Sequence, residues 1–241
     1  MLISGKKKSV AGFFHFPANP ELKKFFEKEN IAYFDYGEIS DENGHRPVLA
    51  AMSKIAGELA ILEGSHYFRF PPGRGIMPSD ARVTIVGAGA AGMAAAETAL
   101  GLVVKNIIIF DSNINRFSIS SRFKIKYALA ENIIEVLPQT DLLIGAVAVK
   151  GGPAPKVFTK AMIRSMPKGS VFVDIAIDEG GCSETSQRPT THKNPFFISE
   201  GVIHICITNL PGDVPKTASQ VLSKALLPHL IKYKKLEIVP A

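Results

Sequence analysis

The apolar positions of this chain form short runs that alternate with helical stripes. Runs with the length and composition of buried strands occur at residues 83–86, 106–110, 124–127, 141–147, 170–177 and 201–207. Helices are expected between them, at residues 90–100, 115–122, 131–137 and 159–166. Strands that alternate with helices at this spacing predict a parallel, doubly wound α/β sheet.

The two ends of the chain lie outside this alternation. Residues 10–14 and 31–36 read as strands on either side of a short helix at residues 20–29, with Asn19 at its N-cap. A closing helix is expected over residues 217–232. The first strands and helix form a βαβ unit that is too short to be an independent domain.

A long helix and a linker suggest where the domains divide. Apolar residues recur at helical spacing through residues 49–67, and a Pro- and Gly-rich stretch follows at residues 70–75. We expect a partial domain at residues 1–50, completed by residues 214–241. The main domain would be residues 51–213, with the helix bridging the two.

Composition narrows the class of protein. With 46% hydrophobic and 21% charged residues, the 241-residue chain is globular, and no apolar run reaches the length of a membrane span. The N-terminal stretch lacks the apolar core and cleavage site of a signal peptide. We therefore expect a cytoplasmic protein that binds no membrane.

The net charge of +6 invites comparison with nucleic-acid binders. Basic residues cluster only at Lys6 to Lys8 and Lys232 to Lys235, which are expected to be solvated chain ends, so no nucleic-acid partner is predicted. Cys182 and Cys206 are too few for a disulfide framework or a Cys-based zinc site, and no metal site is predicted.

The strand at residues 83–86 leads directly into a glycine motif. Gly87, Gly89 and Gly92 form G-x-G-x-x-G, and Ala90 and Ala91 open an alanine-rich helix. In a dinucleotide site the first glycine allows a tight turn, the second admits the pyrophosphate, and the third lets the helix pack on the strand. The helix N-terminus then points free N–H groups at the phosphates. A structural turn without ligand is the alternative.

The next strand strengthens the dinucleotide interpretation. It ends in Asp111, nineteen positions after Gly92, where an acid can accept hydrogen bonds from the adenosine ribose. A 2′-phosphate beside this carboxylate would be repelled, so Asp111 favours NAD over NADP. Arg116, five residues later, is the one feature that could accommodate such a phosphate. The motif predicts a Rossmann-type sheet that binds NAD.

Ligands of an open parallel sheet bind beyond the carboxyl ends of its strands. The residues that follow the later strands are therefore candidates: Val147 and Ala148, Asp178, and Asn209. Asp178 could orient water or an amine, or it could be a turn acid that accepts backbone N–H groups. Asn209 could contact the nicotinamide amide or simply start a turn. His15 could carry protons, or serve packing or the surface.

Several segments resemble one known family. The run VDIAIDEGGCSETSQRPTTHKNP at residues 173–195 closely resembles the signature of alanine dehydrogenases, and GAGAAG with Asp111 fits the same family. So do PVLAAMSKIAGELA, LLIGAVAVKGGPAPK and CITNLPGDVPKTAS. The resemblance extends from His15 to about Pro228.

The resemblance implies a reaction and the roles of several residues. The family oxidatively deaminates L-alanine to pyruvate and ammonia with NAD. It implies that His15 is the catalytic histidine, Asp178 the catalytic aspartate, Asn209 the asparagine beside the nicotinamide, and Ser53 a contact of the phosphates. Together with the glycine loop, the expected cofactor contacts are Ser53, Gly87, Gly89, Ala90, Ala91, Gly92, Asp111, Arg116, Val147, Ala148, Asp178 and Asn209.

The chain also departs from the family. Relatives carry a long segment before the histidine that supplies the arginine and lysine gripping the substrate carboxylate, and neither has a matching position here. The family's metal-associated glutamate aligns with Gly37, next to Glu38. We expect a homo-oligomer, either a hexamer or a dimer, or association with a separately encoded N-terminal part.

Two other functions stay open. The chain could be an NAD-binding remnant without catalysis, because the groups that grip the substrate are missing. It could also be the NAD-binding component of a proton-translocating transhydrogenase, although GGCSETSQRPTTHKNP resembles the dehydrogenases instead.

Overall fold

The structure is a computed structural model that describes residues 9–69, 72–113, 125–129, 132–149 and 152–235. The chain divides into two compact units. We call Ser53–Asp213 the sheet unit, and Met1–Met52 with Val214–Ala241 the terminal unit.

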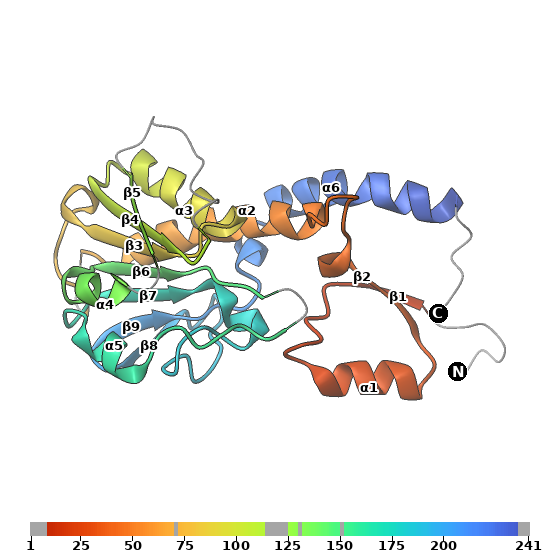
Figure 1. Ribbon diagram of the computed structural model, residues 1–241, viewed down its shortest axis with the longest axis horizontal. Helices are drawn as coiled ribbons and strands as arrows, with labels where there is room; N and C mark the ends of the chain where they lie inside the picture. Colours follow the sequence, from red (N-terminus) through yellow and green to blue (C-terminus); the bar gives the residue numbers. More distant parts are fainter. Residues whose placement is uncertain (1–8, 70–71, 114–124, 130–131, 150–151, 236–241) are drawn as a thin grey trace. The chain divides into compact units, whose positions relative to one another are not determined.

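The strands of the sheet unit that lie in the described ranges form one seven-stranded sheet (Figure 1). Their spatial order is β5 (Ile125–Leu129), β4 (Asn106–Asp111), β3 (Arg82–Val86), β6 (Leu142–Gly145), β7 (Val171–Asp174), β9 (Val202–Ile205) and β8 (Phe196–Ser199). All neighbours pair in parallel except β8 and β9. The predicted parallel, doubly wound sheet is confirmed.

Strand β8 was not predicted. It joins β9 through a two-residue turn in which Glu200 has φ 53° and Gly201 has φ 80°. Positive φ at both central residues gives the twist that a tight antiparallel hairpin requires. Glutamate is an unusual residue at such a position, so the sequence carries little turn signal there.

The helices of the sheet unit are α2 (Pro47–His66, shared with the terminal unit), α3 (Ala90–Gly101), α4 (Ile133–Val136) and α5 (Lys160–Ser165). The 3-10 turns η2 (Pro78–Asp80) and η5 (Leu137–Gln139) precede β3 and β6, and η7 (Leu210–Asp213) closes the unit. The expected helix at residues 115–122 lies outside the described residues.

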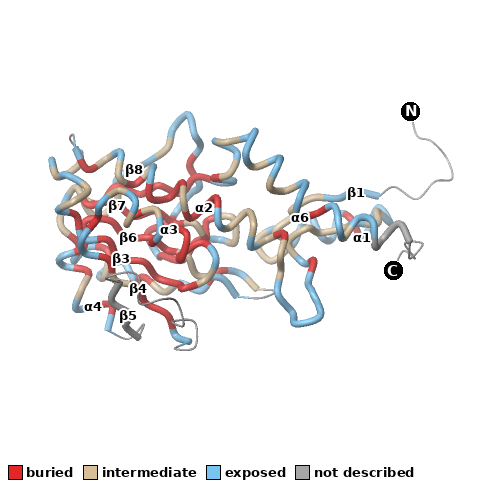
Figure 2. Tube along the Cα trace, turned by 90° about the horizontal axis from the view of Figure 1, so that it is seen from above, coloured by how far each residue is buried: buried red, intermediate tan, exposed pale blue. Residues whose placement is uncertain are grey.

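Helices cover both faces of the sheet. On β6, Leu143 packs in a buried cluster with Ile163 of α5. Its neighbour Leu142 points the other way, close to Gly64 of α2. Helix α3 lies on the α2 face, because it meets α2 at Gly57. Figure 2 shows buried residues gathered along these strands, which explains their continuous apolar runs.

The strand predicted at residues 170–177 ends early, at Asp174. The Asp174 carboxylate accepts a hydrogen bond from the Ala176 N–H at 3.0 Å, which starts the 3-10 turn η6 (Ile175–Glu179). A side chain that bonds its own following backbone competes with strand pairing. The turn carries Asp178 out of the sheet.

The terminal unit contains β1 (Ser9–Gly12), α1 (Pro20–Lys28), β2 (Ala32–Asp35), η1 (Tyr36–Glu38), the start of α2, and α6 (Pro215–Lys235). The two strands pair in parallel, as the βαβ pattern predicts. A small core of Ile39, Val48 and Leu226 joins them to the helices. Asn19 occupies the N-cap position of α1 without capping it, since its side-chain amide donates to the Phe14 carbonyl instead.

Within the described ranges, none of the helices combines the length and apolar character that crossing a membrane requires.

Candidate functional site

The glycine loop connects β3 to α3 at the carboxyl edge of the sheet. Gly87 has φ +107°, and a Cβ there would lie 2.3 Å from the Ala146 carbonyl oxygen. A Cβ at Gly92 would lie 1.8 Å from the Gly87 carbonyl oxygen. Both clashes are with backbone, which cannot rotate away, so these two positions accept only glycine.

Gly89 differs from the other two. It precedes the first residue of α3 with φ −80° and ψ −169°, and a Cβ there would meet nothing within 4 Å. The next residue, Ala90, is exposed, while Ala91 is buried. Open space therefore lies over the N-terminus of a twelve-residue helix, where backbone N–H groups favour an anion. A diphosphate fits this loop.

Ser53 belongs to the helix that packs beside this loop. Gly57 of α2 lies so close to α3 that a Cβ would be 2.0 Å from the Ala91 carbonyl oxygen. Ser53 lies one turn earlier on the same face of α2. The structure places its half-buried hydroxyl one turn from the α2–α3 contact.

Asp111 ends β4 and is 5% exposed. Its Oδ2 accepts a hydrogen bond from the Ala88 N–H at 2.7 Å, and Oδ1 accepts from the Asn113 N–H at 2.8 Å. The carboxylate therefore holds the glycine loop in place. A carboxylate offers about four acceptor positions, so these bonds are compatible with another to a ribose hydroxyl. Arg116 lies outside the described residues.

The loop after β6 borders the glycine loop. The Ala146 N–H donates to the Val86 carbonyl at 2.8 Å, which continues the β3–β6 pairing. The Val147 nitrogen would be 3.3 Å from a Cβ on Gly87, and Ala148 is exposed. Both predicted contacts thus lie at the edge of the sheet where a ligand would bind.

The structure brings Asp178 and Asn209 together. The Asp178 Oδ2 accepts a hydrogen bond from the Asn209 backbone N–H at 3.1 Å. Asn209 is exposed and has φ 52°, so it is also a turn residue. Asp178 does cap a backbone N–H, as the structural alternative suggested. The same bond places two candidate residues side by side beyond β7 and β9.

His15 lies in the terminal unit, after β1. Its φ is +48°, and its carbonyl accepts hydrogen bonds from the Ala18 and Asn19 N–H groups at 3.0 and 2.9 Å. A non-glycine residue in this region is strained and occurs at turns or functional sites. The half-buried imidazole stacks on Phe13 with 6.3 Å between ring centroids.

Nothing in the described part of the chain groups three or more His, Cys, Asp or Glu side chains so that they could hold a metal ion. Glu38 instead pairs with Arg46, with 3.5 Å between Oε1 and Nη1. The two cysteines are buried, and burial, followed by the nearby Asp174 carboxylate, raises the pKa of both thiols, that of Cys206 to about 12. Neither is a thiolate at neutral pH.

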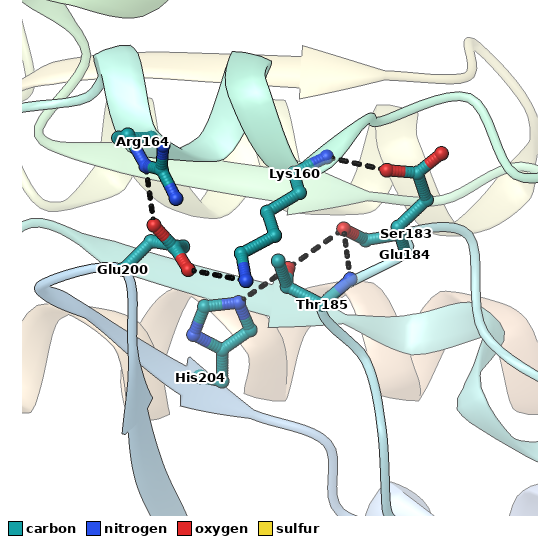
Figure 3. Close-up of polar contacts among 7 residues, drawn as sticks. All are labelled: Lys160, Arg164, Ser183, Glu184, Thr185, Glu200 and His204. Carbon is teal, nitrogen blue, oxygen red and sulfur yellow. Dashed lines mark hydrogen bonds and ion pairs between the residues drawn. The ribbon is translucent and has the colours of Figure 1, made fainter.

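The polar signature loop points inward, which sequence reasoning missed. Ser183 Oγ lies 2.8 Å from Thr185 Oγ1, and Thr185 Oγ1 lies 2.7 Å from Nε2 of His204 on β9 (Figure 3). The His204 Nδ1 faces the Val202 carbonyl at 2.9 Å, so Nδ1 carries the proton and Nε2 accepts from Thr185. This buried chain of hydrogen bonds ties the loop to the sheet.

Surface ion pairs lie beside the hydrogen bonds of Ser183, Thr185 and His204. Glu200, in the β8–β9 turn, pairs with Lys160 at 3.1 Å and with Arg164 at 2.6 Å (Figure 3). Glu184 accepts the backbone N–H of Lys160 at 2.7 Å, close to the start of α5. These contacts join α5 to the loop and the hairpin, and exposed pairs of this kind contribute little stability.

His204 predicts a pH dependence of stability. Burial is the largest cause that lowers its pKa from 6.5, so the unfolded chain binds the proton first as the pH falls. We expect the free energy of unfolding to decrease as the pH falls from 6.5 towards the lower folded pKa. His204→Gln, which keeps a donor and an acceptor, should remove this part of the slope.

Urea denaturation of both chains between about pH 5 and 8 measures the difference, in which the other titrating groups cancel. Parallel curves for the two chains would contradict the prediction.

Comparison with known proteins identifies the family of this chain. The profile of the family described as "Alanine dehydrogenase/PNT, C-terminal domain" matches residues 60–240. Alanine dehydrogenase from Halomonas elongata is 38% identical over 231 residues, which is 91% of this chain and 62% of that protein. The enzyme from Mycolicibacterium smegmatis is 34% identical over 239 residues, 94% of this chain and 64% of that protein. The chain thus spans less than two thirds of these relatives.

Solved structures share the fold. An L-alanine dehydrogenase matches with a TM-score of 0.83 at 34% identity, covering 95% of this chain and 66% of that one. A transhydrogenase from Sinorhizobium meliloti matches with a TM-score of 0.76 at 22% identity, covering 95% of this chain and 69% of that one, which shows a common fold only. The match to this family and to alanine dehydrogenases confirms the predicted cofactor, NAD. The chain belongs to the alanine dehydrogenase/PNT C-terminal domain family.

Proposed function

We propose that this chain is the NAD-binding part of an alanine dehydrogenase, which converts L-alanine, NAD⁺ and water to pyruvate, ammonium, NADH and a proton. The observation that carries the proposal is the contact between Asp178 and Asn209 at the carboxyl edge of the sheet that holds the glycine loop. Relatives named alanine dehydrogenase support the reaction. In this proposal the sheet unit binds the cofactor, and the terminal unit is part of the substrate domain.

The glycine loop and Asp111 bind the cofactor. Backbone N–H groups at the start of α3 would hold the diphosphate, Ser53 would donate to it from α2, and Asp111 would accept from the adenosine ribose. When bound, NAD supplies the hydride acceptor for the substrate α-carbon. Asp111 disfavours a 2′-phosphate by charge repulsion.

In this proposal the two halves of the dinucleotide would lie on opposite sides of β3. β4 lies on one side of β3 and carries Asp111, while β6, β7 and β9 lie on the other side. The adenosine end therefore belongs with β4, and the nicotinamide end with Asp178 and Asn209. Asn209 offers its side-chain amide to the nicotinamide, and the Asp178 carboxylate orders the water or ammonia. His15 moves a proton at its imidazole.

Turnover by defined variants tests the proposal. The chain, alone or mixed with the N-terminal segment of a relative, should form NADH from L-alanine and NAD⁺. Asp178→Asn and His15→Gln should each lower turnover by about 100-fold or more, because general acid–base groups contribute factors of that size. Absorbance of NADH measures the rate.

Glu179→Gln is the matched control, because it changes the neighbouring carboxylate of the same loop, and it should keep turnover. If the chain binds NADH but shows no turnover, either alone or with the added N-terminal segment, the catalytic proposal is rejected and the protein only binds NAD. Full turnover by Asp178→Asn would reject the assigned role of that residue.

A further inference from the structure

We propose that Asp174 is a positioning residue for the nicotinamide end of the site. Its buried carboxylate holds the loop that carries Asp178 and ties it to the strand end that leads to Asn209. The inference rests on the proposed function, because it takes Asp178 and Asn209 as the residues that meet the nicotinamide and the substrate.

The carboxylate of Asp174 accepts hydrogen bonds from a single loop. It ends β7 and is 0% exposed. Its Oδ1 accepts hydrogen bonds from the Ala176 N–H at 3.0 Å and the Cys182 thiol at 3.2 Å. Its Oδ2 accepts from the Cys182 N–H at 2.8 Å and the Ser186 hydroxyl at 2.5 Å. All four donors lie in residues 175–186, so one side chain binds both ends of the Asp178 loop.

The same network reaches the neighbouring strand. Thr190 follows Ser186 in the same loop, and its Oγ1 accepts a hydrogen bond at 3.0 Å from the N–H of Cys206, the residue after β9. Asn209 follows three positions later, and its N–H donates to Asp178 at 3.1 Å. A ring of contacts therefore runs from Asp174 through the Ser186–Thr190 segment and the end of β9 to Asn209, and back through Asp178. A shift of the Asp174 carboxylate would therefore change the distance between Asp178 and Asn209.

The loop is packed too closely to adjust independently. Gly181 has φ +76°, and a Cβ there would lie 3.0 Å from Asp174 Oδ2. Burying a carboxylate is costly unless every acceptor position is satisfied. The four donors satisfy the carboxylate in one conformation of the loop. An apolar residue at this position would bind none of these donors, so the loop could adopt several conformations.

Two ligands that differ only in the nicotinamide separate positioning from general stability. Titration calorimetry with NADH and with ADP-ribose measures affinity for the whole dinucleotide and for the part without nicotinamide. Asp174→Asn presents an amide N–H to donors and should weaken NADH about tenfold or more, which is about 1.4 kcal/mol. ADP-ribose should stay within about twofold. The fluorescence of bound NADH should shift towards that of free NADH.

Two further variants provide a substitute test and a control for Asp174→Asn. Ser186→Ala removes one donor and keeps the carboxylate, so it provides the test if Asp174→Asn does not fold. It should weaken NADH more than ADP-ribose, by a smaller factor than Asp174→Asn. Asp141→Asn is the matched control: this buried aspartate, at the opposite edge of the sheet, accepts the Arg82 N–H at 2.8 Å and pairs with Arg74. It should lower stability and leave both affinities unchanged.

The binding results separate the positioning role of Asp174 from NAD binding and from the reaction. Equal losses for both ligands, or none, in Asp174→Asn and Ser186→Ala would overturn the positioning role. A wild-type chain that binds neither ligand would overturn NAD binding itself, and the inference with it. Wild-type binding of both, without alanine turnover, would reject only the reaction.

Discussion

Gly92→Ala is expected to destabilise the protein by about 3 kcal/mol or more. The added methyl carbon would lie 1.8 Å from the Gly87 carbonyl oxygen and 3.2 Å from Ile85. Relief requires moving α3 away from β3, at the centre of the sheet, where β3 pairs with strands on both sides. Urea denaturation followed by circular dichroism measures the loss.

Gly101→Ala is the control for Gly92→Ala. Gly101 is the last residue of α3, and a Cβ there meets nothing within 4 Å, so the change should be neutral or slightly stabilising. Wild-type stability of Gly92→Ala would show that helix and strand do not approach as described.

Gly89→Ala extends the same experiment from folding to binding. No neighbour opposes the methyl group and the backbone conformation is ordinary, so stability should change by less than about 1 kcal/mol. The methyl group would nevertheless fill the space over the α3 N-terminus, and NADH affinity should fall about tenfold or more. Unchanged NADH affinity would place the diphosphate elsewhere.

Asp111→Ala is expected to reduce both stability and cofactor affinity. The change leaves the Ala88 N–H, and the N–H of Asn113, without the acceptor that now binds them at 2.7 and 2.8 Å. Ala88 is buried whereas Asn113 is exposed, and one unpaired buried donor costs about 1–3 kcal/mol, so a loss of about 2 kcal/mol is expected. Loss of the ribose acceptor should weaken NADH by roughly 10- to 100-fold.

Asp111→Asn distinguishes the two roles. It keeps one carbonyl oxygen for the loop, so it should lose less stability than alanine, yet it removes the charge that repels a 2′-phosphate. The preference for NADH over NADPH should therefore fall in both variants. Calorimetry with both nucleotides measures it, and a preference that survives in both would assign the discrimination to other residues.

The glycine site could be predicted because its chemistry is local in sequence. Strand, turn, helix and terminal acid all lie within residues 82–111, and the closest atom to a Cβ at Gly92 is the Gly87 carbonyl oxygen of the same motif. The parallel sheet followed from the alternation of apolar runs with helices. Hairpin strand β8 was missed because its turn residue Glu200 adopts a positive φ that its type does not signal.

The loop after β7 shows where such reasoning stops. Its polar residues suggest an exposed reactive loop, and Asp178 does lie half-buried at the edge. Asp174, Thr185 and His204, however, are buried, and they bond across segments 8 to 19 residues apart. Their partners are not neighbours in sequence, so spacing along the chain carries no sign of them.

The sequence by itself determined the strand–glycine–helix–acid unit and the order of elements, because these depend on neighbouring residues and on hydrophobic period. Only the tertiary structure decided which polar side chains turn inward and which ones meet beyond the strand ends, as Asp178 and Asn209 do. Burial and hydrogen-bond partners arise when distant segments pack, and each buried polar group must then find its partner across the fold.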